Sequence, residues 1–266
     1  MNKFYIQIAL FLLNVSVYLN NQALASEPAP RKSIFKSKDR YATSEEIYEK
    51  NKDRLCTNPE EIQNAEKLMN EAIEHLVHHA TNNDGYKLHE KGYGSSPSCY
   101  KKKHNDNTDV EKFIYKKDDP NKYNKLVADI WNPDIITPVE YKSTKRKITR
   151  VYNPNLVIIQ QRYKDSLFGR RKYFYALAKK AQISEDKTII VMTSANIIDH
   201  HPSDKEYKNT IVESANLFKI DIDSEEDIRK GKLNKVFLNI GGYLIEKKDK
   251  CVNVTYIESI DENGSN

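Results

Sequence analysis

The chain has 266 residues, with 43 lysines and arginines against 38 acids and a formal charge of +5. So small a basic excess does not require nucleic acid as a partner, and we expect none. The three cysteines are too few for a disulfide-dense scaffold, so core packing must carry the fold. One bridge plus one free thiol remains open, and the sequence does not choose the pair.

The first 25 residues are typical of a cleaved signal peptide. Lys3 precedes a mostly apolar run over residues 4–18, and Ala23 and Ala25 form a small-x-small cleavage pattern. That run is short and interrupted for a membrane span. Residues 26–43 carry two prolines and a basic cluster, which predicts a flexible linker. We therefore expect a secreted protein whose folded domain spans residues 44–262.

Helices are predicted early in the chain. Ser44 is the predicted cap of a short helix with acids in its first turn, and Asn58 followed by Pro59 starts a longer one. Asp119-Pro120 starts a third helix, which carries Trp131. The Gly-, Ser- and Lys-rich stretch before it is assigned no regular element. The long helix places these apolar residues on one face: Ile62, Ala65, Leu68, Met69, Ala72, Leu76 and Ala80.

Strands follow the helices. Alternating segments are predicted over residues 147–152, 156–163, 172–182, 188–194, 235–246 and 251–258. Their short spacing requires antiparallel neighbours. The chain is therefore an α+β protein with N-terminal helices and a curved antiparallel sheet, not an alternating α/β protein. A long twisted sheet of this kind forms a cup for an apolar ligand.

The strand over residues 172–182 has two different faces. Alternation puts Phe174, Ala176 and Ala178 on one face and Tyr173, Tyr175 and Leu177 on the other. The first set is more apolar with smaller members, so we expect it to line the cup. In the preceding strand we expect Leu156, Ile158 and Gln160 to accompany it.

Candidate catalytic and metal sites are weak. His75 and His79 lie four residues apart on one helix, with Glu71 a turn before, but the His-Glu-x-x-His pattern is absent and a polar flank is the better interpretation. The segment from Asp199 to Pro202 is typical of a turn. We predict no catalytic residue, no metal and no cofactor.

Two further motifs have structural or surface explanations. Gly241 and Gly242, inside a strand pattern, indicate a bulge or a close approach of backbone. The basic run at Lys142, Lys145, Arg146 and Lys147 indicates either a solvated hairpin or a rim that meets anionic head groups.

Several segments resemble the START lipid-transfer domain. They are the run from Arg171 to Leu177, the strand ending at Ser194 with His201-Pro202 after it, the helix end at residues 128–131, and the last strand with Asp261. In place of the family's Arg-Asp pair stands Arg171-Lys172. A START domain also closes its cavity with a C-terminal helix, which is expected to be missing here.

The whole chain is more similar still to the Fam-a proteins of rodent malaria parasites. The shared segments are Ser44 to Asn51, Arg150 to Leu156 and Lys179 to Lys187. This resemblance implies a START-like helix-grip fold and export to the parasitophorous vacuole or the host red cell. It also implies binding or transfer of phospholipid, phosphatidylcholine in particular.

We therefore expect a non-enzymatic, monomeric protein that binds phospholipid and touches membrane surfaces transiently. The candidate polar contacts are Gln160, Arg171 and Tyr175. The candidate acyl-chain contacts are Trp131, Ile158, Phe174 and Met192. The alternative is a START-derived interaction protein that lacks lipid transfer and presents its surface to host proteins.

Overall fold

The computed structural model describes residues 41–94, 96–105, 108–140, 143–166, 169–203 and 205–262. Residues 42–266 form one compact unit. The predicted signal peptide and nearly all of the predicted linker lie outside the described residues. None of the described helices is long and apolar enough to cross a membrane.

The helices and strands occur in the following order. The N-terminal part contains α2 (Ser44–Lys50), η1 (Lys52–Arg54), α3 (Pro59–Thr81), β1 (Lys87–Glu90), β2 (Ser98–Asn105), β3 (Thr108–Asp118), η2 (Pro120–Lys122) and α4 (Tyr123–Trp131). The middle contains β4 (Lys145–Asn153), β5 (Leu156–Tyr163), β6 (Lys172–Ser184), β7 (Lys187–Thr193) and β8 (Asn196–Ile198). The C-terminal part contains η3 (Glu213–Asn216), β9 (Lys219–Asp221), α5 (Glu226–Arg229), β10 (Asn234–Lys235), β11 (Phe237–Lys247) and β12 (Cys251–Asp261).

The main sheet confirms the α+β prediction. Its strands lie in the order β1-β2-β3-β12-β11-β7-β6-β5-β4, and every neighbouring pair on this path is antiparallel. The short strand β10 adds to β6 in parallel, and β8 pairs with β9 in a separate small sheet. Three strands of the main sheet, β1 to β3, lie in the Gly-, Ser- and Lys-rich stretch, to which the sequence pattern assigned no element.

The long helix confirms its predicted start signal. The Asn58 side chain accepts hydrogen bonds from the backbone N–H groups of Glu60 and Glu61, and Pro59 occupies the first helical position. The shorter helix α2 differs from prediction by one residue. Its cap is Thr43, which forms a reciprocal capping box with Glu46, so Ser44 is the first helical residue.

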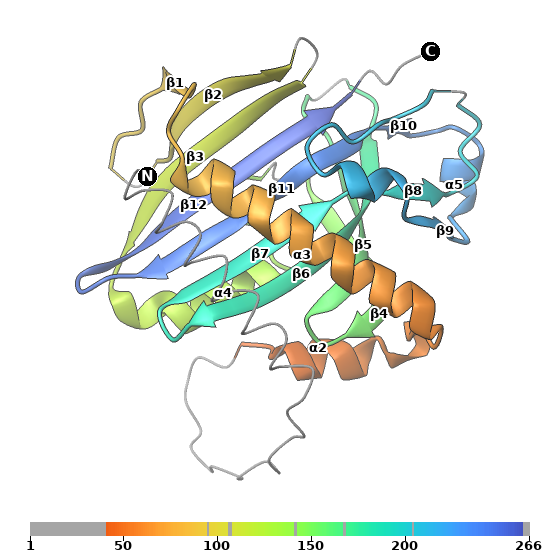
Figure 1. Ribbon diagram of the computed structural model, residues 1–266, viewed down its shortest axis with the longest axis horizontal. Coiled ribbons are helices and arrows are strands. Elements are labelled where there is room, and N and C mark those ends of the chain that lie inside the picture. Colours follow the sequence, from red (N-terminus) through yellow and green to blue (C-terminus); the bar gives the residue numbers. More distant parts are fainter. Residues whose placement is uncertain are drawn as a thin grey trace, which may run out of the picture. The chain divides into compact units, whose positions relative to one another are not determined.

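Helices cover both faces of the sheet. In Figure 1, α3 crosses in front of the central strands and α4 lies behind them. α3 contacts β6, β7, β11 and β12 and buries Leu68, Met69, Ala72, Ile73 and Leu76, whereas Ile62 and Ala80 are only half-buried. α4 contacts β7 and β11 on the other side. We call the side covered by α4 the interior face and the other side the α3 face.

The central strands are buried on both sides, as this layering requires. All of Leu156 to Gln161 in β5 is buried, as is Tyr173 to Lys179 in β6. Lys179 lies on the α3 face, where its ammonium group donates to Asn70 Oδ1 at 2.8 Å and pairs with Glu66. The three cysteines are free thiols. The question of a C-terminal helix concerns residues after Glu262, outside the described part of the chain.

The paired glycines mark a close approach of backbone, as predicted. Gly242 has φ of 147°, and a Cβ atom there would lie 2.2 Å from the carbonyl oxygen of Ile190. At Gly241 the nearest atom to such a Cβ belongs to the flexible Leu238 side chain, at 3.1 Å. A side chain at position 242 would therefore clash with backbone, whereas a side chain at position 241 would meet only a flexible side chain.

We expect Gly242→Ala to lower the free energy of unfolding by about 2 kcal/mol or more, because β7 must move away to admit the methyl group. Gly241→Ala, the matched control, should cost less, because a side chain gives way more easily than backbone. Urea denaturation of both variants measures the difference. Equal losses would contradict this account of Gly242.

Candidate functional site

The interior face and α4 enclose a small apolar cavity of about 20 Å³. Its lining comes from α4, the residues after it and five strands: Ile130, Trp131, Pro133, Arg146, Ile148, Val157, Ile159, Ala178, Ile190, Met192 and Tyr243. Such a volume holds about one water molecule, so the space is nearly filled by side chains. We call it the interior cavity.

The predicted acyl-chain contacts divide between the two faces. Trp131 and Met192 line the interior cavity, and Phe174 belongs to the same apolar cluster beside Tyr163, with ring centroids 6.5 Å apart. Ile158 does not join them. It pairs with Leu177 and therefore lies on the α3 face.

The predicted polar contacts lie away from the interior cavity. Gln160 pairs with Tyr175 on the α3 face, and its amide donates to the Tyr175 hydroxyl at 2.6 Å and to Glu225 Oε2 at 2.7 Å. Arg171 is exposed at the start of β6. The structure thus brings together three of the seven predicted residues and leaves four elsewhere.

The prediction of which β6 side chains line the interior face is right, and the same prediction for β5 is wrong. Ala176 pairs with Ile159 and Ala178 with Val157, so Val157, Ile159 and Gln161 share the interior face with Phe174. Leu156, Ile158 and Gln160 face the other way. The reason is physical: β5 is buried on both sides, so its apolar residues do not alternate and give no sign of direction.

One polar residue of the interior cavity was missed. Arg146 was placed in the basic run, yet its side chain is only 5% exposed and lines the cavity. Its guanidinium pairs with Glu140 at 3.0 Å and donates to the carbonyl oxygen of Ile135. Among the described residues its Nε–H finds no hydrogen-bond partner. The alternation of β4 could have indicated this, because Arg146 stands between exposed Lys145 and Lys147.

Glu140 and Tyr243 are held by the segment that follows α4. The backbone N–H of Thr137 donates to Glu140 Oε2 at 2.7 Å, and its hydroxyl lies 2.8 Å from the Tyr243 hydroxyl. This segment thus fixes the acid that pairs with Arg146. The positive charge of Arg146 is compensated, but one of its donors still points into an apolar wall.

An aromatic and acidic corner lies beside the cavity on the same face. The rings of Tyr243 and Tyr256 lie 4.6 Å apart, and Phe113 lies 5.9 Å from Tyr256. The Tyr256 hydroxyl donates to Glu258 Oε1 at 2.7 Å. Burial raises the pKa of Glu258 to about 7, and the nearby carboxylates of Glu111 and Glu140 add to the shift. We call this group the aromatic corner.

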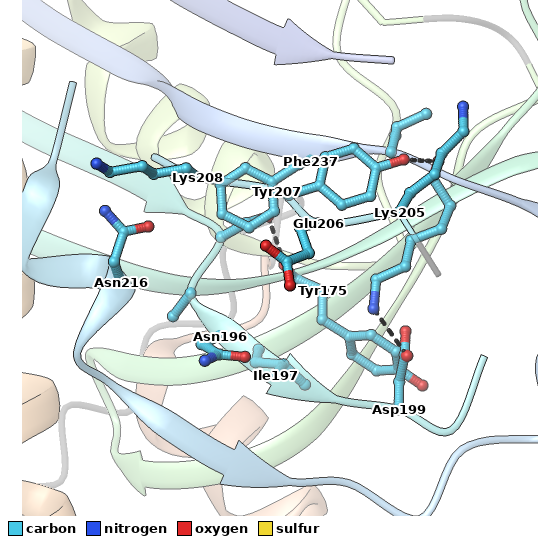
Figure 2. A pocket seen from close by; sticks show the side chains of 14 residues that line it. Tyr175, Asn196, Ile197, Asp199, Lys205, Glu206, Tyr207, Lys208, Asn216 and Phe237 are labelled. Carbon is cyan, nitrogen blue, oxygen red and sulfur yellow. Dashed lines mark hydrogen bonds and ion pairs between the residues drawn. The ribbon is translucent and has the colours of Figure 1, made fainter. Parts of the chain in front are cut away.

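A pocket at the surface has a different character. It measures about 460 Å³ and contains the buried Asp199, which accepts from Lys235 Nζ at 2.8 Å (Figure 2). Asp199 also accepts from the Tyr173 hydroxyl at 2.9 Å. Tyr207 stacks on Phe237 with ring centroids 5.6 Å apart. The buried acid is already paired with a lysine and a tyrosine, so we assign this pocket no ligand.

The histidine motifs form no metal site in the described residues. His75 Nε2 lies 3.9 Å from Glu71, and His79 is buried with its Nδ1 2.9 Å from the Tyr86 hydroxyl. Burial lowers the pKa of His79 to about 3, so this ring is neutral. His201 contacts the carbonyl oxygen of Leu233 at 3.1 Å. These histidines fulfil packing and hydrogen-bonding roles.

Comparison with known proteins identifies the fold. No protein-family profile and no curated protein matches the chain. Human StAR-related lipid transfer protein 5 is similar with a TM-score of 0.53 and 11% identity, covering 76% of this chain and 84% of that one. Human STARD10 is similar with a TM-score of 0.47 and 15% identity. The match covers 72% of this chain and 66% of the STARD10 chain. A STAR-related lipid transfer protein fragment from Xanthomonas axonopodis is similar with a TM-score of 0.40 and 11% identity. The match covers 69% of this chain and 85% of that fragment.

The sheet order, the covering helices and the likeness to human StAR-related lipid transfer protein 5 together define a START-like helix-grip fold. The predicted fold class is therefore confirmed.

The raised pKa of Glu258 predicts a dependence of stability on pH. Because its pKa in the fold lies above the usual carboxyl value, the fold favours the protonated form, and stability falls as pH rises from about 5 to 8. Glu258→Gln should flatten this slope by on the order of 1 kcal/mol over that interval. Urea denaturation at several pH values measures it, and exposed Glu74→Gln is the control. An unchanged slope after Glu258→Gln would contradict the assignment.

Proposed function

We propose that this protein binds a phospholipid non-covalently between the interior face and α4 and transfers it between membranes. The observation that carries the proposal is an apolar cavity with one buried arginine in its wall, inside a START-like fold. Apolar walls with a few placed polar groups are typical of ligand sites. The similar human structure is itself described as a lipid transfer protein, which supports the same assignment.

The ligand must make its own room. A cavity of about 20 Å³ cannot hold an acyl chain, so α4 and the segment after it have to move away from the sheet. That segment, residues 132–144, contains no helix or strand in its described part. Trp131, Phe174 and Met192 would contact the chains in the opened site. Ile158, Gln160, Tyr175 and Arg171 would not, because of where they lie.

The polar groups favour a zwitterionic head group. Arg146 offers an unpaired N–H to a phosphate. Tyr243, Tyr256 and Phe113 offer aromatic faces to a quaternary ammonium group. The positive charge of such a group would favour the ionised form of Glu258, which lies beside the Tyr256 hydroxyl. These features support phosphatidylcholine, the lipid implied by the resemblance to Fam-a proteins.

The remaining parts of the proposal rest on the sequence. We propose a secreted monomer with no covalent catalysis that meets membranes transiently and reaches the parasitophorous vacuole or host red cell. The Fam-a resemblance and the predicted signal peptide support secretion and export.

The small cavity favours one alternative, an interaction protein that keeps the scaffold without carrying lipid. Native mass spectrometry of Ser26 to Asn266 from a lipid-rich host separates the two functions. A phospholipid bound at near one-to-one ratio would support lipid binding. A folded protein free of lipid would support the interaction protein.

The role of Arg146 is tested by a double variant, Glu140→Gln with Arg146→Gln. It removes both charges together, so no buried ion is left unpaired. We expect at least about tenfold weaker phosphatidylcholine binding, because a charge-assisted bond to the phosphate is lost. Titration with fluorescent phosphatidylcholine measures the dissociation constant.

The matched control is Arg171→Gln, which removes an exposed arginine at the start of β6. Its affinity should equal that of the unchanged protein. An unchanged affinity in the double variant, with a normal melting temperature, would exclude Arg146 from the head-group site.

A further inference from the structure

A second pocket adjoins the interior cavity from outside. It measures about 280 Å³ and lies between α2 and the residues that follow α4. Pro133, Arg146 and Ile148 line both this pocket and the interior cavity. These side chains therefore form a common wall between the surface and the interior. We call the outer space the α2 pocket.

The α2 pocket is closed by a weak contact. Lys50 on α2 and Asp134 after α4 both line it, and their charged groups lie 3.4 Å apart. Both side chains are about 70% exposed (74% and 67%), and ion pairs so exposed contribute about 1 kcal/mol or less. Separating α2 from the 132–136 segment at this point therefore breaks only a weak electrostatic contact.

Exposed apolar side chains stand next to this contact. Ile135 and Ile136 directly follow Asp134 and are 38% and 45% exposed. Two neighbouring isoleucines in water are unfavourable but suit the acyl region of a bilayer. Lys50 and Arg54 on the pocket rim suit lipid phosphates. The chemistry of this surface is thus that of a membrane contact.

From the shared wall, the weak contact and the exposed isoleucines, we infer that the α2 pocket is the entrance to the interior cavity. The 132–136 segment meets the bilayer, α2 and this segment separate, and a lipid passes Arg146 into the interior. The occupant of the pocket is a single phospholipid taken from the membrane. This inference rests on the proposed function.

The test is a reversible tether across the entrance. Lys50→Cys and Asp134→Cys are introduced in a Cys56→Ser, Cys251→Ser background, which leaves only the buried Cys99, and a short bis-maleimide with a cleavable linker joins them. We expect the tether to slow phosphatidylcholine exchange with vesicles at least tenfold. Equilibrium occupancy in preloaded protein should stay unchanged. Cleaving the linker should restore the rate.

The control tether joins Glu226→Cys and Lys230→Cys in the same background. These residues form an exposed pair at i,i+4 on and just after α5, and neither of them lines the α2 pocket. Equal exchange rates in the two tethered proteins, with lipid bound, would overturn the entrance alone. Absence of bound lipid in the unchanged protein would overturn the proposed function itself, and the entrance with it.

A second variant tests the membrane contact without any tether. Ile135→Ser with Ile136→Ser changes exposed side chains only, so folding should be unaffected. We expect exchange with vesicles to slow severalfold, while binding of monomeric short-chain phosphatidylcholine is unchanged. Equal loss with both ligands would contradict a role in membrane contact.

Discussion

The register of the central antiparallel strands is the constraint on which the site depends. Because side chains alternate, the pairing of Ala178 with Val157 and Met192 decides that all three face α4. A slip of one residue would turn the polar groups of Gln160 and Tyr175 inward and the cavity lining outward. The α3 face holds the register, since Lys179 reaches Asn70 and Glu66 on the helix above it.

Arg146 is the costly feature of the interior face. A buried guanidinium is tolerated because Glu140 and a backbone carbonyl satisfy part of it. Its Nε–H nevertheless remains unsatisfied among the described residues, a cost of about 1–3 kcal/mol in a buried site. A cavity built for stability alone would favour an apolar residue here. In the proposed function this cost is offset when the Arg146 guanidinium meets the phosphate of the ligand.

The sequence predicted the elements whose signals are local. The Asn58-Pro59 start of α3 and the strands from β4 to β7 were predicted because caps and apolar runs need no knowledge of distant partners. β2 and β3 were missed because they lie toward the sheet edge and carry six lysines between them, so apolar residues do not dominate either segment. Most of β2 is lysine, histidine or asparagine. Their pairing with β12 is what makes them strands.

The site was only partly predictable for the same reason. That Trp131, Phe174 and Met192 lie in the apolar cluster of the interior face could be predicted from hydrophobicity and strand alternation. Whether Ile158 or Ile159 faces inward depends on pairing, which two adjacent isoleucines do not reveal. Arg146 was not recognised because it belongs to a basic run. Its side chain is buried, unlike its neighbours in the run, because residues 135–140 contact it.

The size of the interior cavity in the closed protein does not by itself decide against a lipid. Moving α4 exposes its three buried side chains, Tyr123, Ile130 and Trp131, at about 2–3 kcal/mol for each. A buried methylene contributes about 0.8 kcal/mol, so roughly 8 to 11 methylenes offset that exposure. A phospholipid chain is longer than this. The free energy that remains must still overcome the ordering of the ligand and the loss of the Thr137–Tyr243 contact. Under the proposed function, the segment after α4 would therefore set the affinity for lipid.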